Sequence, residues 1–385
     1  MLWYPDTKLL TDDTHPLSGP TAMPKTATTP IPVTLLTGFL GSGKTTLLNR
    51  LVRQPAMDRT LVIINEFGEI GLDHRLFSAT DETEVVALES GCLCCTIRGD
   101  LARTLRDAPW RYAREGRRQF DRVVIETTGL ADPAPILHTL MTEPRLVGQY
   151  RLDGIVTTVD AVHGGATLDQ HAEALKQAAV ADRLLLTKAD LAPPEALATL
   201  ARRLAEINPG AGQRQVVQGE IEASALTGLG LMGEDGTRPD LARWIDAYAQ
   251  PPSLAGLAFS AGPTGAGTLL TPVGGDAPDP TRDPNRHDDR IRAHCFTLDA
   301  PIDLGRFEAW LELMAALMGE NMLRIKGILN LAGRERPTVI HGVQHIFHPP
   351  VELDAWPDED RRSRLVFITR DIPRESLESL LVAVS

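Results

Sequence analysis

The segment that most constrains the fold runs from residue 31 to residue 52, IPVTLLTGFLGSGKTTLLNRLV. It reads as an apolar strand, a glycine-rich turn and an amphipathic helix. The turn matches the P-loop pattern, in which backbone N–H groups at a helix N-terminus form a concave site for phosphate oxygens. The pattern therefore predicts a nucleotide site formed by Gly38, Gly41, Ser42, Gly43, Lys44, Thr45 and Thr46.

Charged and hydroxyl side chains in and near this turn have predicted chemical roles. Lys44 is expected to reach the β- and γ-phosphates, and the Thr45 hydroxyl is expected to ligate Mg²⁺. The stretch RVVIETTGLADP (122–133) begins with a short apolar strand that ends in Glu126, and Gly129 follows three residues later. These are the positions where a P-loop protein places its second acidic residue and its γ-phosphate-sensing glycine. Lys44, Glu126 and Gly129 are thus the predicted catalytic residues.

A third apolar run, RLLLTKADL (183–191), ends in Thr187, Lys188, Ala189 and Asp190. It resembles the Asn-Lys-x-Asp motif that reads guanine, with threonine in place of asparagine. A carboxylate at Asp190 can accept hydrogen bonds from both donors on one edge of guanine, a pair that adenine lacks. The motif favours GTP and GDP over adenine nucleotides, although a solvated turn is the alternative. Ser224 and Ala225 offer a weaker signal for a loop that touches the base.

Between the P-loop and a group of cysteines lies TLVIINEFGEIGLD (60–73), an apolar strand followed by a loop with three carboxylates, Glu66, Glu69 and Asp73. Such a loop can approach Mg²⁺, a γ-phosphate or a second metal. Its alternative is an ordinary solvated connection, because acidic loop residues are mostly exposed.

Three of the four cysteines, Cys92, Cys94 and Cys95, lie within four residues at a predicted strand-to-helix junction. Thiolates at this spacing suit Zn²⁺, Cu(I) or Co²⁺, with an outside ligand for which Glu66 is the candidate. The predicted metal ligands are therefore Cys92, Cys94, Cys95 and Glu66, with Thr45 on Mg²⁺. Buried packing and a redox thiol pair are the alternatives.

Composition limits the classes of partner that the protein can bind and the cellular compartment that it can occupy. A formal net charge of −12 over 385 residues argues against a general binder of nucleic acid or of anionic membranes. No apolar run is long enough to span a bilayer, and the first residues lack a signal-peptide pattern, so a cytoplasmic protein is expected. Four cysteines in that compartment favour metal or redox chemistry over disulfides.

Five motifs occur in the order GFLGSGKTT, NEFGEIGLD, ESGCLCCTIRGDL, IETTGLADP and TKAD. In this order they resemble the CobW family of P-loop GTPases, relatives of the GTPases that mature urease and hydrogenase. The resemblance covers residues 31–250, and a later segment (LRIKGILNLAG to RSRLVFITRDI) is similar to the family's C-terminal domain. It implies a metallochaperone that binds GTP with Mg²⁺, binds Zn²⁺ or Co²⁺ at the cysteines, and couples hydrolysis to transfer of the metal to a client protein.

The resemblance also bears on the metal and on the rate of hydrolysis. Some cobalt-linked members carry a long histidine-rich stretch, whereas residues 161–175 hold only His163 and His171. This favours zinc, with cobalt delivery for cobalamin biosynthesis as the alternative. The motifs contain no evident catalytic Gln or Arg, so we expect slow intrinsic hydrolysis.

The alternation of strands and helices predicts a P-loop NTPase of the α/β class, with a doubly wound, mostly parallel sheet over residues 31–250. Residues 1–30 are expected to be disordered, residues 251–290 read as a flexible linker, and residues 291–385 as a small α+β domain. In that domain the alternation of a strand would put His341 and His345 on one face and His348 on the other, which disfavours a three-histidine metal site. Hydrogen-bonded strand histidines are favoured, with a partner surface or an auxiliary metal contact as the alternative.

Two other functional classes stay open from the sequence. One is a metal storage or sensing protein in which GTP is only structural. The other is a P-loop kinase that uses ATP, which the TKAD motif opposes. The client protein and the oligomeric state do not follow from the sequence.

Overall fold

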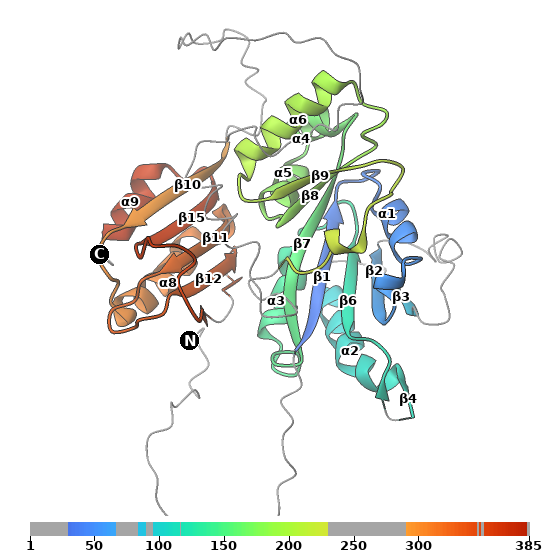
Figure 1. The fold of residues 1–385 in the computed structure, drawn as a ribbon, viewed down its shortest axis with the longest axis horizontal. Coiled ribbons are helices and arrows are strands. Elements are labelled where there is room, and N and C mark those ends of the chain that lie inside the picture. The colour runs from blue at the N-terminus through green and yellow to red at the C-terminus, as the bar shows by residue number, and fades with distance from the viewer. Residues whose placement is uncertain are drawn as a thin grey trace, which may run out of the picture.

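The computed structural model describes residues 30–66, 84–89, 95–115, 117–229, 290–344, 346–347 and 350–382. These residues form two parts, each built on its own sheet, with the helices and strands arranged as in Figure 1. Residues 1–29 and 230–289 lie outside the described residues, so the predicted disorder of the N-terminus, the predicted linker and the domain boundaries stay predictions.

The first part is a seven-stranded sheet with the order β3-β2-β6-β1-β7-β8-β9. Each neighbouring pair of strands is parallel, so all seven carboxyl ends lie at one edge. The strands are β1 (Ile31–Gly38), β2 (Thr60–Glu66), β3 (Glu84–Glu89), β6 (Arg122–Thr127), β7 (Tyr150–Asp160), β8 (Arg183–Thr187) and β9 (Gly212–Val216). A short hairpin of β4 (Ala113–Arg114) and β5 (Arg117–Arg118) lies apart from this sheet.

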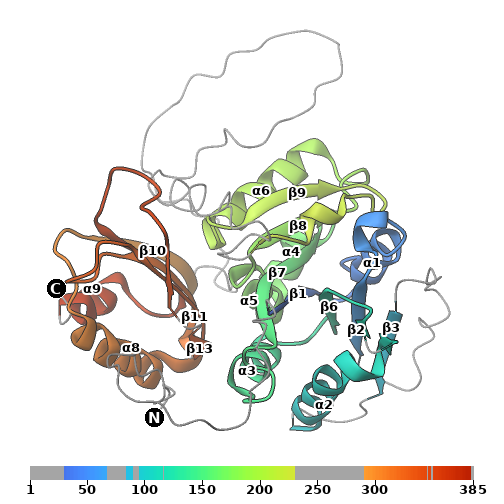
Figure 2. The same ribbon diagram turned by 60° about the horizontal axis from the view of Figure 1, so that its bottom comes forward.

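Helices cover both faces of this sheet (Figure 2). They are α1 (Lys44–Leu51), α2 (Cys95–Arg111), α3 (Ala134–Thr142), α4 (Gly164–Gln170), α5 (Ala172–Ala179) and α6 (Pro194–Ile207), with single 3₁₀ turns η1 (Pro55–Met57) and η3 (Ala223–Ala225). Alternate strand residues face opposite sides, because successive side chains of a strand point to opposite faces. Leu35 belongs to the buried cluster that includes residues of α2, α3, α5 and α6, whereas Leu36 belongs to the one that includes residues of α1 and of the segment after β9.

The second part is an antiparallel sheet with the order β10-β15-β11-β12-β13, with β14 paired to β12. Its strands are β10 (Ile291–Leu298), β11 (Met322–Leu329), β12 (Thr338–Val343), β13 (Ile346–Phe347), β14 (Val351–Glu352) and β15 (Ser363–Arg370). One face is covered by α8 (Leu304–Met318), with a short 3₁₀ turn η6 (Gly319–Asn321) after it, and by α9 (Arg374–Val382). Asp303 caps α8, since its Oδ1 accepts a hydrogen bond from the Arg306 N–H at 3.0 Å.

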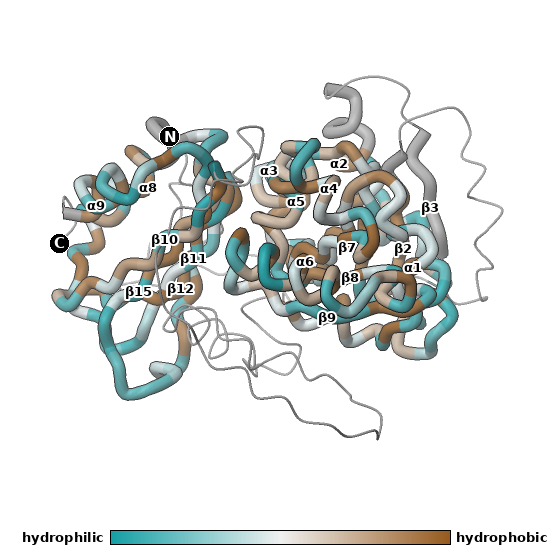
Figure 3. Tube along the Cα trace, turned by 90° about the horizontal axis from the view of Figure 1, so that it is seen from above, coloured by the Kyte–Doolittle hydropathy of each residue, from teal (hydrophilic) through white to brown (hydrophobic). Residues whose placement is uncertain are grey.

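The other face of this second sheet packs against the first part. Leu323, Val343, Ile346 and Ile368 belong to the same buried cluster as side chains of α3, α5 and α6. In Figure 3 the two parts lie side by side, and hydrophobic segments, shown in brown, run along strands of both. The two sheets therefore share a continuous apolar contact.

A buried ionic cluster lies within this contact. Asp182, which follows α5, pairs with Arg324 and Lys326 of β11, and the Lys326 Nζ to Asp182 Oδ1 distance is 2.7 Å. Asp182 also accepts the Ile155 N–H at 2.9 Å. The side chains of Asp182 and Arg324 are 5% and 3% exposed, so the pair is shielded from water. Burial acts to raise the pKa of Asp182, but Arg324 and Lys326 outweigh it and the pKa lies below its usual range.

The predicted fold class is confirmed in both parts: a doubly wound parallel sheet with a P-loop, and a smaller α+β unit. The strand, long helix and closing helix expected from residue 291 onward correspond to β10, α8 and α9. Within the described residues, no helix combines the length and the apolar character needed to cross a membrane.

Candidate nucleotide and metal site

The predicted site residues follow successive strands along one edge of the parallel sheet. The P-loop follows β1, Glu126 is the penultimate residue of β6 one strand away, and Glu66 ends β2 beyond it. On the other side of β1, β7 ends in Asp160 and β8 ends in Thr187. Because neighbouring strands lie about 4.8 Å apart, the end of β3, three strands from β1, is roughly 14 Å from the end of β1. The TKAD turn follows β8 on the opposite side of β1. The predicted base site and the predicted metal site therefore lie on opposite sides of the P-loop.

The P-loop has the backbone geometry that its glycines permit. Gly41 and Gly43 have φ of 71° and 89°, which favour glycine over other residues. At Gly38 a Cβ would lie 2.2 Å from Thr158 Oγ1, so only glycine lets β1 and β7 approach here. Lys44 is 8% exposed, and its Nζ donates to the Gly38 carbonyl at 2.8 Å and to the Phe39 carbonyl at 3.2 Å. The lysine charge is therefore held over the loop that is predicted to receive the phosphates.

Thr45 and Glu126 are brought together although they lie 81 residues apart. The Thr45 hydroxyl donates to Glu126 Oε1 at 2.8 Å, and Glu126 is 5% exposed. A hydroxyl and a buried carboxylate at the first turn of the P-loop helix are oxygen ligands of the kind that Mg²⁺ prefers. These two residues fit a magnesium ion beside the phosphates.

The TKAD turn is tied directly to the P-loop. The Thr187 hydroxyl donates to the Ser42 carbonyl at 2.7 Å and to the Val159 carbonyl at 3.2 Å. This gives a physical reason for threonine at the position where the guanine motif has asparagine, since its side chain bridges β7, β8 and the phosphate loop. Asp190 is exposed at the end of the turn. Its carboxylate is thus accessible to a ligand.

Lys188 links the TKAD turn to Asp160 at the end of β7. Its backbone has φ of 55°, and its Nζ donates to Asp160 Oδ2 at 2.6 Å. Asp160 Oδ1 also accepts the N–H groups of Val162 and His163. Burial acts to raise the pKa of Asp160, but the hydrogen bonds from Lys188 and these N–H groups outweigh it. The pKa therefore lies below its usual value, and the carboxylate stays ionised at neutral pH.

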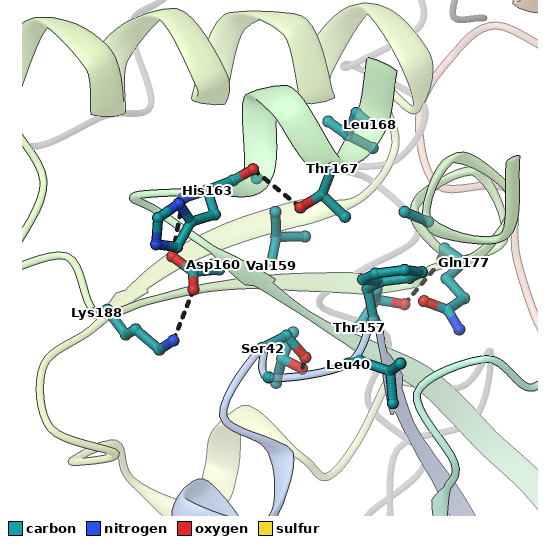
Figure 4. Close-up of a pocket in the computed structure, with 15 residues that line it drawn as sticks. Leu40, Ser42, Thr157, Val159, Asp160, His163, Thr167, Leu168, Gln177 and Lys188 are labelled. Atoms are coloured by element: carbon teal, nitrogen blue, oxygen red, sulfur yellow. Dashed lines mark hydrogen bonds and ion pairs between the residues drawn. The ribbon is translucent and has the colours of Figure 1, made fainter. Parts of the chain in front are cut away.

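A cavity of about 180 Å³ opens beside the P-loop. Figure 4 shows it between Ser42 and Leu40 on one side and His163 and Thr167 on the other. Asp160 and Lys188 line one end, and Gln177 of α5 lines the opposite end. The cavity therefore connects the P-loop to both the TKAD turn and helix α5.

The loop after β6 lies against the P-loop. A Cβ at Gly129 would be 2.6 Å from the backbone nitrogen of Leu40 and 2.7 Å from its Cα, so the two backbones touch. The predicted γ-phosphate-sensing glycine is thus next to the phosphate loop. Leu40 and Leu130 are 58% and 53% exposed, which leaves two apolar side chains at this edge.

The predicted metal ligands are only partly within the described residues. Glu66 ends β2, and in the strand register it lies opposite Glu89 of β3. Its neighbour Asn65 is opposite Thr127 of β6. Cys95 is the first residue of α2, the helix that follows β3 in the chain. Cys92, Cys94, Glu69 and Asp73 lie outside the described residues.

Several neighbours of the site were not singled out in the sequence. Asp160 and Gln177 carry no local motif, and only the parallel pairing of β7 with β1 and β8 places Asp160 there. Ser224 and Ala225 lie elsewhere than expected, because their carbonyls accept from Arg183 Nη1 at the start of β8. The loop that follows β9 approaches α1 instead, where a Cβ at Gly219 would be 3.1 Å from the Thr46 carbonyl oxygen.

The histidines of the second sheet give no metal site within the described residues, where no group of three or more potential ligands occurs. His341 is buried on β12, with its Nε2 3.1 Å from Arg324 Nη2. This agrees with the prediction of a hydrogen-bonded strand histidine. His345 and His348 lie outside the described residues.

Comparison with known families gives two matches. The CobW/HypB/UreG nucleotide-binding domain matches residues 32–215, and the cobalamin synthesis protein cobW C-terminal domain matches residues 291–385. The chain is 32% identical over 351 residues to the zinc chaperone YjiA of Escherichia coli, covering 91% of this chain and 97% of that protein. It is 27% identical over 405 residues to the zinc chaperone CobW of Pseudomonas aeruginosa, covering 95% of each.

Among solved structures, the zinc(II)-bound YjiA GTPase from E. coli aligns with a TM-score of 0.64 and 28% identity. The alignment covers 93% of this chain and 100% of that chain, so it includes both sheets. The two family matches cover the P-loop part and, after it in the chain, the antiparallel part. The chain therefore belongs to the CobW family.

Proposed function

We propose that this protein is a GTP-hydrolysing metallochaperone that binds zinc and couples GTP hydrolysis to transfer of the metal to a client protein. The observation that carries the proposal is the order of strand ends along one sheet edge. Along that edge the strands that precede the TKAD turn, the P-loop, Glu126 and Cys95 follow in the order β8, β7, β1, β6, β2 and β3, which supports the proposal.

GTP is the proposed nucleotide because the exposed Asp190 is held at the end of a turn that Thr187 ties to the P-loop. The β- and γ-phosphates would lie at the N-terminus of α1, with Lys44 turning from the Gly38 carbonyl toward them. Thr45 and Glu126 would hold Mg²⁺, which when bound neutralises charge on the β- and γ-phosphate oxygens.

The residues of this protein would contribute to hydrolysis mainly by positioning the phosphates. Lys44 stabilises negative charge that develops on the phosphate oxygens, and Gly129 offers its backbone N–H to the γ-phosphate from a loop that touches Leu40. The sequences of the motifs contain no evident catalytic Gln or Arg. Slow intrinsic turnover that awaits a partner is therefore part of the proposal.

The metal cargo is proposed to bind Cys92, Cys94 and Cys95 with Glu66 as an additional ligand. Thiolates with one carboxylate form a donor set that suits Zn²⁺ and also accepts Co²⁺. The relatives named zinc chaperones support zinc. Glu66 ends the strand between β6 and β3, so a loop ordered by the γ-phosphate can shift a ligand of the metal.

We also propose that the protein is cytoplasmic, that its client is a metalloprotein, and that it has no nucleic-acid or membrane partners. The net charge of −12 supports the exclusion of polyanionic partners.

GTP turnover with and without Zn²⁺ or Co²⁺ tests the proposal. We expect slow hydrolysis of GTP, much slower hydrolysis of ATP, and a rate that changes when Zn²⁺ fills the cysteine site. ATP turnover equal to GTP turnover would contradict the assignment of the base. A rate unaffected by either metal would favour a metal storage or sensing protein in which GTP is structural.

A further inference from the structure

The loop of residues 128–132, called here the sensor loop, connects the nucleotide site to the rest of the molecule. Gly129 touches the backbone of Leu40, so the loop lies next to the predicted γ-phosphate position. If Gly129 senses the γ-phosphate, as the proposed function holds, the conformation of this loop decides whether its N–H can reach that phosphate. Residues that hold the loop can therefore set the preference between GTP and GDP.

Helix α5 holds the sensor loop from within the parallel-sheet part. Gln177 is 1% exposed, and its Nε2 donates to the Gly129 carbonyl at 3.2 Å and to the Ala131 carbonyl at 3.1 Å. The Thr157 hydroxyl of β7 in turn donates to the Gln177 carbonyl at 2.8 Å. The first half of the loop is thus fixed by a buried side chain on a rigid element.

The far end of the sensor loop is held from both parts of the protein. Lys176 of α5 donates to Asp132 Oδ2 at 2.6 Å, and the Ala134 N–H donates to Asp132 Oδ1 at 3.0 Å. Gln344 follows β12 in the antiparallel sheet, and its Nε2 donates to the same Asp132 Oδ2 at 3.3 Å. Asp132 therefore accepts hydrogen bonds both from α5 and from the antiparallel part, at the end of a loop beside the predicted nucleotide site.

The backbone at Gln344 has a conformation that glutamine rarely adopts. Its φ of 54° lies in the left-handed region, where glycine costs less than glutamine. Gln344 is 5% exposed at the turn between β12 and β13, and its N–H donates to the Leu323 carbonyl at 3.2 Å. That backbone bond would survive in a glycine, so what glutamine adds here is the amide that reaches Asp132.

Docking of the two sheets does not require this contact. The buried cluster of Asp182 with Arg324 and Lys326, together with the apolar cluster around Leu323 and Ile368, already joins the parts. The Gln344 contact instead reaches Asp132 in the sensor loop, which lies next to the predicted nucleotide site.

We propose that Gln344 and Asp132 are positioning residues through which the antiparallel sheet holds the sensor loop in its GTP-binding conformation. The proposal rests on the proposed function, because it takes Gly129 as the group that senses the γ-phosphate. By linkage, GTP binding then stabilises the contact between the two sheets by the same factor by which the contact favours GTP.

The test uses the full-length chain and four variants: Gln344→Gly, Gln344→Asn, Asp132→Ala and the double variant Gln344→Gly/Asp132→Ala. Gln344→Gly relieves the backbone and removes the amide, while Gln344→Asn keeps an amide and tolerates the left-handed backbone but is one methylene too short. Asp371→Gly is the matched control, because Asp371 also has a left-handed backbone, with φ of 55°, and is exposed. Affinities for a non-hydrolysable GTP analogue and for GDP are measured with thermal unfolding of each variant.

We expect both Gln344 variants to bind the GTP analogue about 3–10-fold more weakly, which lies within the range of one lost hydrogen bond of ordinary strength, with GDP affinity changed less than about twofold. The double variant should be no weaker than the Asp132→Ala variant, since both remove the same contact. Asp371→Gly should resemble the unmodified protein. Thermal stability of Gln344→Gly should be unchanged or higher.

An unchanged ratio of GTP to GDP affinity in both Gln344 variants would overturn the proposal, as would additive effects in the double variant. Loss of thermal stability with an unchanged ratio would show a purely structural contact and would also overturn it. If the unmodified protein neither hydrolyses GTP nor distinguishes it from GDP, the proposed function itself fails, and that result is read from the unmodified protein alone.

Discussion

Replacing Asp182 by asparagine should destabilise the folded chain strongly. Asp182 is the carboxylate of a buried cluster in which its side chain is 5% exposed, Arg324 is 3% exposed and Lys326 is 15% exposed. Asparagine keeps an acceptor for the Ile155 N–H but leaves a buried guanidinium without its counter-charge. Removing one partner of a buried pair costs about 3–5 kcal/mol in free energy of unfolding.

The expected cost lies near the upper part of that range at neutral pH. The Arg324 Nη1 atom already lacks a hydrogen-bond partner among the described residues, so the guanidinium has little to compensate the loss. The pKa of Asp182 is lowered in the folded state. Its contribution is therefore fully present above the unfolded value of about 3.9 and is lost as the pH falls through the folded pKa.

Urea unfolding at pH 7 and at progressively lower pH measures this prediction. The control is Asp121→Asn, which weakens an exposed pair with Arg59, where the two side chains are 57% and 45% exposed, and which should cost less than about 1 kcal/mol. The difference between the unmodified chain and Asp182→Asn should shrink toward acid pH. A loss below about 1 kcal/mol at pH 7, equal to the control, would refute the reasoning that the cluster is desolvated.

Three further predictions concern the site. Lys44→Ala should abolish hydrolysis and greatly weaken nucleotide binding, because the charge facing the phosphates is lost; turnover equal to the unmodified protein would exclude the P-loop role. Asp190→Asn should relax the choice between guanine and other bases, since an amide offers one acceptor oxygen where a carboxylate offers two; an unchanged GTP preference in competition binding would remove Asp190 as base reader. Replacing Cys92, Cys94 and Cys95 by serine should remove tight Zn²⁺ binding but leave GTP affinity in metal-free buffer nearly intact, because serine is a poor ligand for borderline metals; retained tight binding in a metal titration would move the site elsewhere.

The parts of the structure that were predictable from sequence are those with local periodicity. The apolar runs at residues 31–38, 60–66, 122–127 and 183–187 became strands of the parallel sheet, and the P-loop glycines took the left-handed geometry that their pattern requires. The common location of motifs that directly follow strands was also predictable, because the carboxyl ends of parallel strands lie at one edge of the sheet.

Contacts between distant residues were not predictable. Asp132 and Gln344 lie 212 residues apart, and Asp182 and Arg324 lie 142 residues apart. Neither pair belongs to a local pattern, since each depends on how the antiparallel sheet docks on α3, α5 and α6. The bridging role of Thr187 was hidden for a related reason. A single hydroxyl between two strands and a loop has no sequence signature, and only the register of β7 and β8 places it against Ser42.

The central claim is that the nucleotide controls the metal site, and it is tested most directly by Zn²⁺ affinity in two nucleotide states. The reduced chain is titrated with Zn²⁺ under anaerobic conditions, once with a non-hydrolysable GTP analogue bound and once with GDP bound. We predict affinities that differ by about 5–150-fold, the range of couplings of about 1–3 kcal/mol, with the same factor separating nucleotide affinities with and without Zn²⁺. Identical Zn²⁺ affinity in the two states would contradict the account and leave a passive metal site beside a GTPase.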